Sequence, residues 1–282
     1  MLVTLAACAS DPGAADAKRQ LQVASDPAAI LRIATAAERA GDPASAAAFY
    51  RRAADLQPDS DTAAIGVARS LVELDRTDEA IDRLRGVHLR RPDDTLIAAT
   101  LGRLLVVAHR PQDALAAFAD GLHADPRSAS LLIGQGVALD ATGQHGAAQD
   151  SYRAALSLTP DSIPAKNNLA LSLAITGHAE EAVALLRALQ STTDTADRAT
   201  VDGNLALAYG LQGDAANAAA TARRALPDRH VAANLAAHVA LKGQGTPGGA
   251  GAATGEPGMM LPGPGPLGAP PPADPPGVDG PN

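Results

Sequence analysis

The chain has 282 residues, of which 46% are apolar and only 2% are aromatic, and its net charge is −8. A core that is rich in alanine and poor in rings favours closely packed helices over a β-sandwich or barrel. The negative charge repels phosphate backbones, and no basic stripe or aromatic platform offsets it, so we expect no nucleic-acid partner.

The first segment ends in Cys8, the single cysteine of the chain. Residues 5–8 (Leu-Ala-Ala-Cys) resemble the lipobox at which a bacterial signal segment is cut and the cysteine is lipidated. The resemblance implies that residues 1–7 are a remnant of that segment and that residues 8–26 are a tether. No basic residue precedes Cys8, so we expect a longer signal segment upstream. The alternative is that Cys8 is a small apolar residue in a frayed terminus.

Several residue types then recur every 34 positions. An alanine is followed after four positions by a large apolar residue, and a proline comes eight positions later. The alanine lets two helices approach closely, the large residue fills the gap between them, and the proline ends the second helix. The columns are Ala46, Ala80, Ala114 and Ala148; Tyr50, Leu84, Phe118 and Tyr152; and Pro58, Pro92, Pro126 and Pro160.

These columns predict helix–turn–helix units that resemble tetratricopeptide (TPR) repeats over residues 27–242. The resemblance implies an all-α TPR α-solenoid, which is a right-handed superhelix of antiparallel helix pairs with about six repeats. Aspartates beside the prolines, such as Asp59 and Asp93, are expected to supply turn and cap chemistry. The predicted units begin near Pro27, Asp61, Thr95, Ala129, Ile163 and Ala199.

Three later segments depart from the regular repeat. The polar insert at residues 191–195 follows a unit that lacks its terminal proline, and it predicts a looser joint. A last helix over about residues 231–241 repeats half a unit and is expected to cap the stack. In residues 243–282, glycine and proline supply 23 of the 40 residues, which predicts a disordered tail.

No pattern for catalysis or metal binding stands out. The seven histidines are scattered without an i, i+4 pair, and a single cysteine offers no zinc cluster. The sequence also contains neither a Walker lysine motif nor a GxSxG elbow. We therefore expect a protein that is not an enzyme and that needs no cofactor, metal or small-molecule substrate.

Asparagine recurs ahead of a Leu-Ala pair at one register of three first helices, at Asn168, Asn204 and Asn234. Asparagine is a poor mid-helix residue, but its amide donates and accepts and so matches one peptide unit of an extended ligand. In TPR proteins this register faces the concave groove, which implies a peptide-binding site. The other residues of this predicted site are Asn167, Leu171, Leu207 and Leu211. The alternative is that these amides bond solvent or adjacent loops.

Arginines hold the same face of the first units, at Arg32, Arg69 and Arg103. They would favour an acidic partner segment, or they would form a solvated face if Glu38 and Glu73 paired with them. The second interpretation is the favoured one.

The strings around Asn168 and Asn204, each Asn-Leu-Ala-Leu with a glycine turn after it, also resemble TadD-like lipoproteins of tight-adherence (Flp) pilus assembly. This resemblance implies a pilotin-like scaffold that binds an extended segment of the secretin or of another pilus component. It also implies an outer-membrane location facing the periplasm, with a lipid anchor on Cys8; a cytoplasmic location is the alternative. Two other functions remain open: a general TPR adaptor of the envelope or cytosol with another protein client, and a regulatory domain detached from an enzyme.

Overall fold

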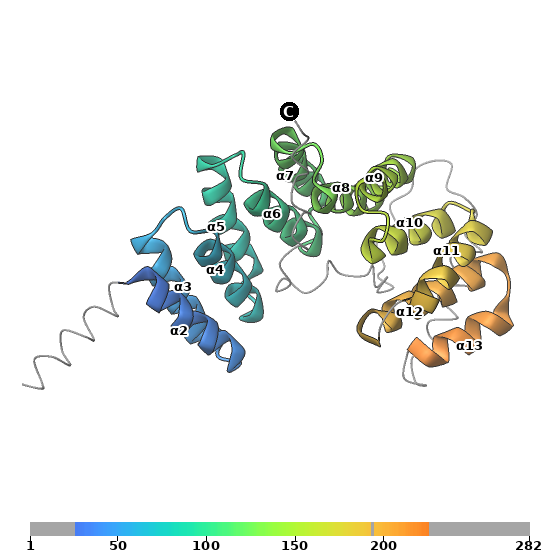
Figure 1. Ribbon diagram of the computed structural model, residues 1–282, viewed down its shortest axis with the longest axis horizontal. Helices are drawn as coiled ribbons and strands as arrows, with labels where there is room; N and C mark the ends of the chain where they lie inside the picture. Colours follow the sequence, from blue (N-terminus) through green and yellow to red (C-terminus); the bar gives the residue numbers. More distant parts are fainter. Residues whose placement is uncertain (1–25, 193–194, 226–282) are drawn as a thin grey trace, which may run out of the picture. The chain divides into compact units, whose positions relative to one another are not determined.

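The computed structural model describes residues 26–192 and 195–225, which are helical apart from short turns (Figure 1). This part of the chain contains twelve helices in six consecutive pairs, so the predicted all-α TPR fold is confirmed. The pairs are α2 (Pro27–Arg39) with α3 (Pro43–Leu56), α4 (Asp61–Glu73) with α5 (Thr77–Arg90), α6 (Thr95–Val107) with α7 (Pro111–Ala124), α8 (Ala129–Ala141) with α9 (His145–Leu158), α10 (Ile163–Ile175) with α11 (Ala179–Thr192), and α12 (Thr195–Gln212) with α13 (Ala215–Ala225).

The chain forms two compact units, Met1–Arg91 and Pro92–Asn282, called unit 1 and unit 2 below. Helices α2 to α5 belong to unit 1, and α6 to α13 belong to unit 2. Four predicted features lie outside the described residues: the Cys8 segment, Asn234, the capping helix and the tail. The right-handed superhelix likewise stays a prediction.

The first helices of the five regular repeats begin at the predicted residues because the residue before each one caps it. Asp94, for example, accepts hydrogen bonds from the backbone N–H groups of Leu96 and Ile97 at 3.1 and 3.0 Å. The capping side chains are Asp26, Ser60, Asp94, Ser128 and Ser162. Asp59 and Asp93 lie in the turns as expected, but the caps come from the residue that follows each of them.

The sixth pair departs from the prediction. Helix α12 begins at Thr195 rather than near Ala199, and Ser191 and Thr192 of the polar insert belong to the end of α11. Helix α11 packs against α12, and the side-chain amide of Gln190 donates a hydrogen bond to Asp202. The looser joint expected at residues 191–195 stays a prediction, because residues 193 and 194 lie outside the described residues.

Aromatic rings of the large column pack directly on the backbone of first helices. Phe118, in α7, is 1% exposed, and its ring lies against both Gly102 of α6 and Gly134 of α8. A Cβ atom at Gly102 would come within 2.6 Å of the ring, and one at Gly134 would come closer still. Real Cβ atoms do not approach neighbours so closely, so both positions require glycine while the ring is present.

The pairing of ring and glycine recurs in other repeats. Tyr50 lies against Gly66, and Tyr152 lies against Gly136. In the second repeat the large residue is the aliphatic Leu84, and the matching small position of its first helix is an alanine. Glycine therefore lies beside all three rings, on the first helix of the same repeat for Tyr152, of the next repeat for Tyr50, and of both repeats for Phe118.

Candidate functional site

In unit 2 the first helix of each pair contacts the first helix of the next pair. These contacts join α6 to α8, α8 to α10, and α10 to α12. The four first helices therefore form a continuous layer, which Figure 1 shows as a succession of neighbouring ribbons. Residues at equivalent places of these helices face the same side of the layer.

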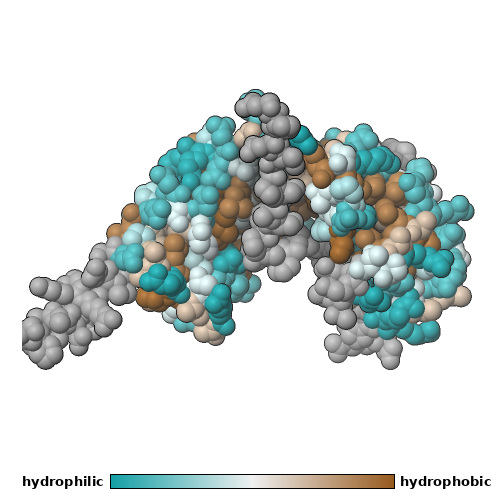
Figure 2. All heavy atoms as spheres, in the orientation of Figure 1, coloured by the Kyte–Doolittle hydropathy of each residue, from teal (hydrophilic) through white to brown (hydrophobic). Residues whose placement is uncertain are grey.

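Five apolar residues share one face of this layer. Val137, Leu171 and Leu207 each follow the small residue of their first helix. Ile133 precedes Val137 by one helical turn, and Leu211 follows Leu207 by one turn, so both extend the same face. Leu171 is 8% exposed and the other four are partly exposed. We call these five residues the first-helix surface; Figure 2 shows brown apolar residues reaching the surface of unit 2 among hydrophilic ones.

Three of the five residues, Leu171, Leu207 and Leu211, were predicted from the sequence as part of a peptide-binding site. Ile133 and Val137 were missed because α8 contains no asparagine to mark the register. The available signal was the repeat spacing, because Val137 stands 34 residues before Leu171 and Ile133 stands one helical turn before Val137. The peptide-binding role of all these residues stays a prediction.

The structure pairs the asparagines in an unforeseen way. The Asn204 amide Nδ2 donates a hydrogen bond to Asn167 Oδ1 at 3.0 Å, and these residues are 8% and 4% exposed. Asn168, which aligns with Asn204 in the repeat, is partly exposed. This hydrogen bond joins α10 to α12. It also gives each buried amide a partner, and a buried polar group without a partner would lower stability. Two predicted site residues are thus brought together, but as a contact between helices.

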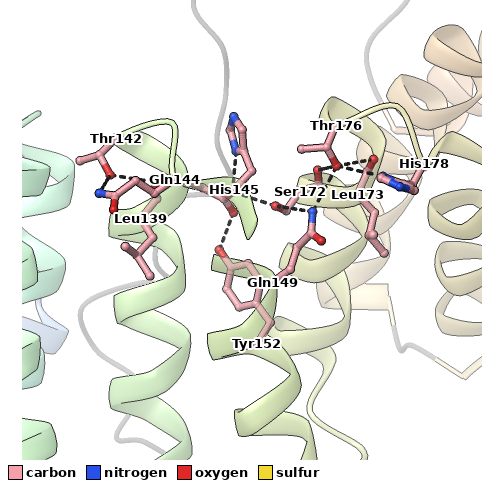
Figure 3. A network of polar contacts seen from close by, with 11 residues as sticks. Leu139, Thr142, Gln144, His145, Gln149, Tyr152, Ser172, Leu173, Thr176 and His178 are labelled. Atoms are coloured by element: carbon pink, nitrogen blue, oxygen red, sulfur yellow. Dashed lines mark hydrogen bonds and ion pairs between the residues drawn. The ribbon is translucent and has the colours of Figure 1, made fainter. Parts of the chain in front are cut away.

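A polar network joins α8, α9 and α10 (Figure 3). Asp140 accepts hydrogen bonds from the Tyr152 hydroxyl at 2.9 Å and from the Ser172 hydroxyl at 2.8 Å. Its Oδ1 atom also lies 2.8 Å from Nδ1 of His145. Burial and the adjacent Asp140 carboxylate raise the pKa of the Tyr152 phenol far above its usual range, so the hydroxyl stays protonated as a donor. The network fixes the fourth repeat against the fifth.

Unit 1 contains a related cluster. The Tyr50 hydroxyl donates to Glu38 Oε2 at 2.9 Å, and the Arg69 guanidinium forms an ion pair with the same carboxylate. In both clusters the acid precedes the tyrosine by 12 residues, which is the sequence signal that would have found them. For Arg69, the structure supports the interpretation of a paired arginine.

In residues 26–192 and 195–225, no three His, Cys, Asp or Glu side chains gather in a way that could hold a metal ion. Within the same ranges, every helix is too short or too polar to cross a bilayer.

Comparison with known proteins places the repeats in a family. The tetratricopeptide-repeat family matches residues 37–104 and, through a second set of repeats, residues 100–163. The uncharacterised protein y4yS of Sinorhizobium fredii is 36% identical over 98 residues, which are 35% of this chain and 54% of that protein. The chain therefore spans about half the length of this curated relative.

Solved structures share the fold at low sequence identity. A TPR protein of Parabacteroides merdae has a TM-score of 0.62 at 16% identity, covering 75% of this chain and 84% of that one. TTC0263, a TPR protein of Thermus thermophilus, has a TM-score of 0.54 at 23% identity, with coverages of 64% and 99%. PilW, a type IV pilus biogenesis factor, has a TM-score of 0.61 at 22% identity, with coverages of 75% and 97%. The family matches and the six packed helix pairs of the described residues together show that this chain is a tetratricopeptide-repeat protein.

Proposed function

We propose that unit 2 binds an extended segment of another protein along the first-helix surface, so that the protein acts as an assembly scaffold. The observation that carries the proposal is the row of apolar side chains at one repeat place on successive first helices. Four of the five side chains are partly open to solvent. A contiguous apolar row of this kind is typical of an interaction site, whereas single exposed apolar residues need no explanation.

The spacing of the row suits an extended ligand. Packed helices lie about 8–10 Å apart, and an extended chain advances about 3.3 Å per residue. About three ligand residues would therefore span the step from Val137 to Leu171, and the same number would span the next step to Leu207. An extended segment with apolar side chains at that interval would bury them on consecutive repeats.

The proposed partner is the secretin or another component of a tight-adherence (Flp) pilus, and the proposed location is the periplasmic side of the outer membrane. The Asn-Leu-Ala-Leu strings at Asn168 and Asn204 and the lipobox-like residues 5–8 support this assignment by their resemblance to TadD-like lipoproteins. The same fold also occurs in PilW, a type IV pilus biogenesis factor.

A complementation experiment tests the pilus role. In a strain that lacks the gene, the wild-type chain and the control Ala154→Asp, on an exposed site of α9, should both restore surface pili and secretin multimers. The double variant Val137→Asp/Leu207→Asp should restore neither, because two carboxylates would face the apolar segment of the partner. Pili would be counted by electron microscopy at matched protein levels. Full restoration by the double variant would contradict the proposal.

The lipid anchor is tested separately. Cys8→Ala, introduced into the precursor with its complete signal segment, should move the protein from the membrane fraction to the soluble fraction. Acyl chains of a lipoprotein give stable attachment, and this variant would lack their attachment site. Continued sedimentation of the variant with membranes would rule out the anchor at Cys8.

A further inference from the structure

Arg103, on α6, stands at the place that Val137, Leu171 and Leu207 hold in the following first helices. It is partly buried, and its Nη2 atom donates a hydrogen bond to the Thr100 hydroxyl at 3.2 Å. Burial lowers the pKa of the Arg103 guanidinium, which is the effect expected for a cation held away from water. Within unit 2, no carboxylate among the described residues pairs with this guanidinium.

The equivalent arginine of unit 1 differs in this respect. Arg69 holds the same repeat place on α4, and Glu38 of the preceding repeat forms an ion pair with it. The residue 34 positions after Glu38 is Val72, so the repeat supplies Arg103 with no counterpart of that acid. A partly buried cation without a counter-ion is costly, and a carboxylate from another molecule would relieve that cost.

We propose that the segment bound by unit 2 contains an aspartate or glutamate whose carboxylate pairs with Arg103, with apolar side chains beyond it along the first-helix surface. The acid would lie at the α6 end, and the apolar side chains would follow toward α12. This proposal rests on the proposed function and adds the chemistry and the orientation of the segment. A planar guanidinium suits the role because its N–H groups match a carboxylate in a bidentate geometry.

Binding of defined peptides to the full chain tests the proposal. The probes are end-blocked, fluorescein-labelled peptides with three leucines at every third position, Asp-Ser-Thr-Leu-Ser-Thr-Leu-Ser-Thr-Leu, and the peptide of reversed order. Matched peptides carry asparagine in place of the aspartate. In fluorescence anisotropy, the aspartate peptide of one of the two orders should bind the wild-type chain about tenfold more tightly than the asparagine peptide of the same order.

The variants separate recognition from structural support. Arg103→Met should remove the preference for aspartate while leaving the affinity for the asparagine peptide unchanged. Arg153→Met, on an exposed site of α9, should keep the preference. The urea midpoint of Arg103→Met should be unchanged or higher, because the substitution removes a partly buried charge. A purely structural role for Arg103 would instead lower that midpoint and weaken both peptides alike.

Each other outcome overturns the proposal. If aspartate and asparagine peptides bound equally and Leu207→Asp abolished their binding, Arg103 would have no role in recognition. The proposed binding surface would then still stand. Binding that emerges only after removal of residues 243–282 would assign the surface to the chain's own tail. Absence of binding by all four peptides would reject the stated ligand chemistry, and the pilus assay would then judge the proposed function independently.

Discussion

Replacing both Gly102 and Gly134 with alanine is expected to lower the free energy of unfolding by about 2–4 kcal/mol. Both new Cβ atoms would meet the Phe118 ring, which is buried and packed between two first helices. Alanine is the better helix former by about 1 kcal/mol at each position, so the loss would reflect overpacking that exceeds this gain. Urea unfolding followed by circular dichroism at 222 nm measures the change.

Two further variants sharpen this result. Gly203→Ala, at a mid-helix position of α12 with open space around its Cβ, should raise stability by up to about 1 kcal/mol. Phe118→Leu, added to the double alanine variant, should recover part of the lost stability, because the second repeat combines a leucine, Leu84, with an alanine, Ala68, at the same two places. A double alanine variant as stable as the wild type would contradict the packing described for this ring.

Asp140→Ala is expected to lower the free energy of unfolding by about 2–4 kcal/mol, because two buried hydroxyl groups would lose their acceptor. Tyr152 and Ser172 are each 1% exposed, so water cannot readily replace the carboxylate. The loss should appear as a lower urea midpoint with the helical signal intact at zero denaturant.

Asp150→Ala supplies the matched control. This carboxylate lies on α9 and is 81% exposed, and it makes only an i, i+3 pair with Arg153. Its removal should change stability by less than about 0.5 kcal/mol, as is usual for exposed ion pairs. If the Asp140 and Asp150 variants lost equal stability, the network between the fourth and fifth repeats would contribute nothing specific.

The helix pairs were predictable from the sequence because their determinants are local. A 34-residue period, the capping side chains and the prolines set where each helix begins and ends, and Pro27, Thr95 and Ile163 all start helices as predicted. Glycine at Gly102 and Gly136 was also foreseeable as a small position, although the need for a second glycine at Gly134 emerged only from the Phe118 ring.

The candidate site was less predictable because its contacts depend on how neighbouring helices pack. The bond from Asn204 to Asn167 joins residues 37 apart, in a part of the chain where an insert breaks the 34-residue register. Alignment of the repeats therefore matched Asn204 with Asn168. In the structure, α10 packs against α12 so that Asn204 forms its hydrogen bond with Asn167 instead. Similarly, sequence alone left two interpretations of Arg69, and its ion pair with Glu38 distinguishes them.

Site-specific photocross-linking would show whether the first-helix surface holds the partner. A photoreactive phenylalanine derivative would replace Val137, Leu171 or Leu207 on the first-helix surface, or Ala154 on α9, in cells that make the pilus. We expect secretin adducts, identified by antibody, from the three surface positions and none from Ala154. Adducts from Ala154 alone, or secretin adducts of equal yield from all four positions, would show that the first-helix surface is not the binding site.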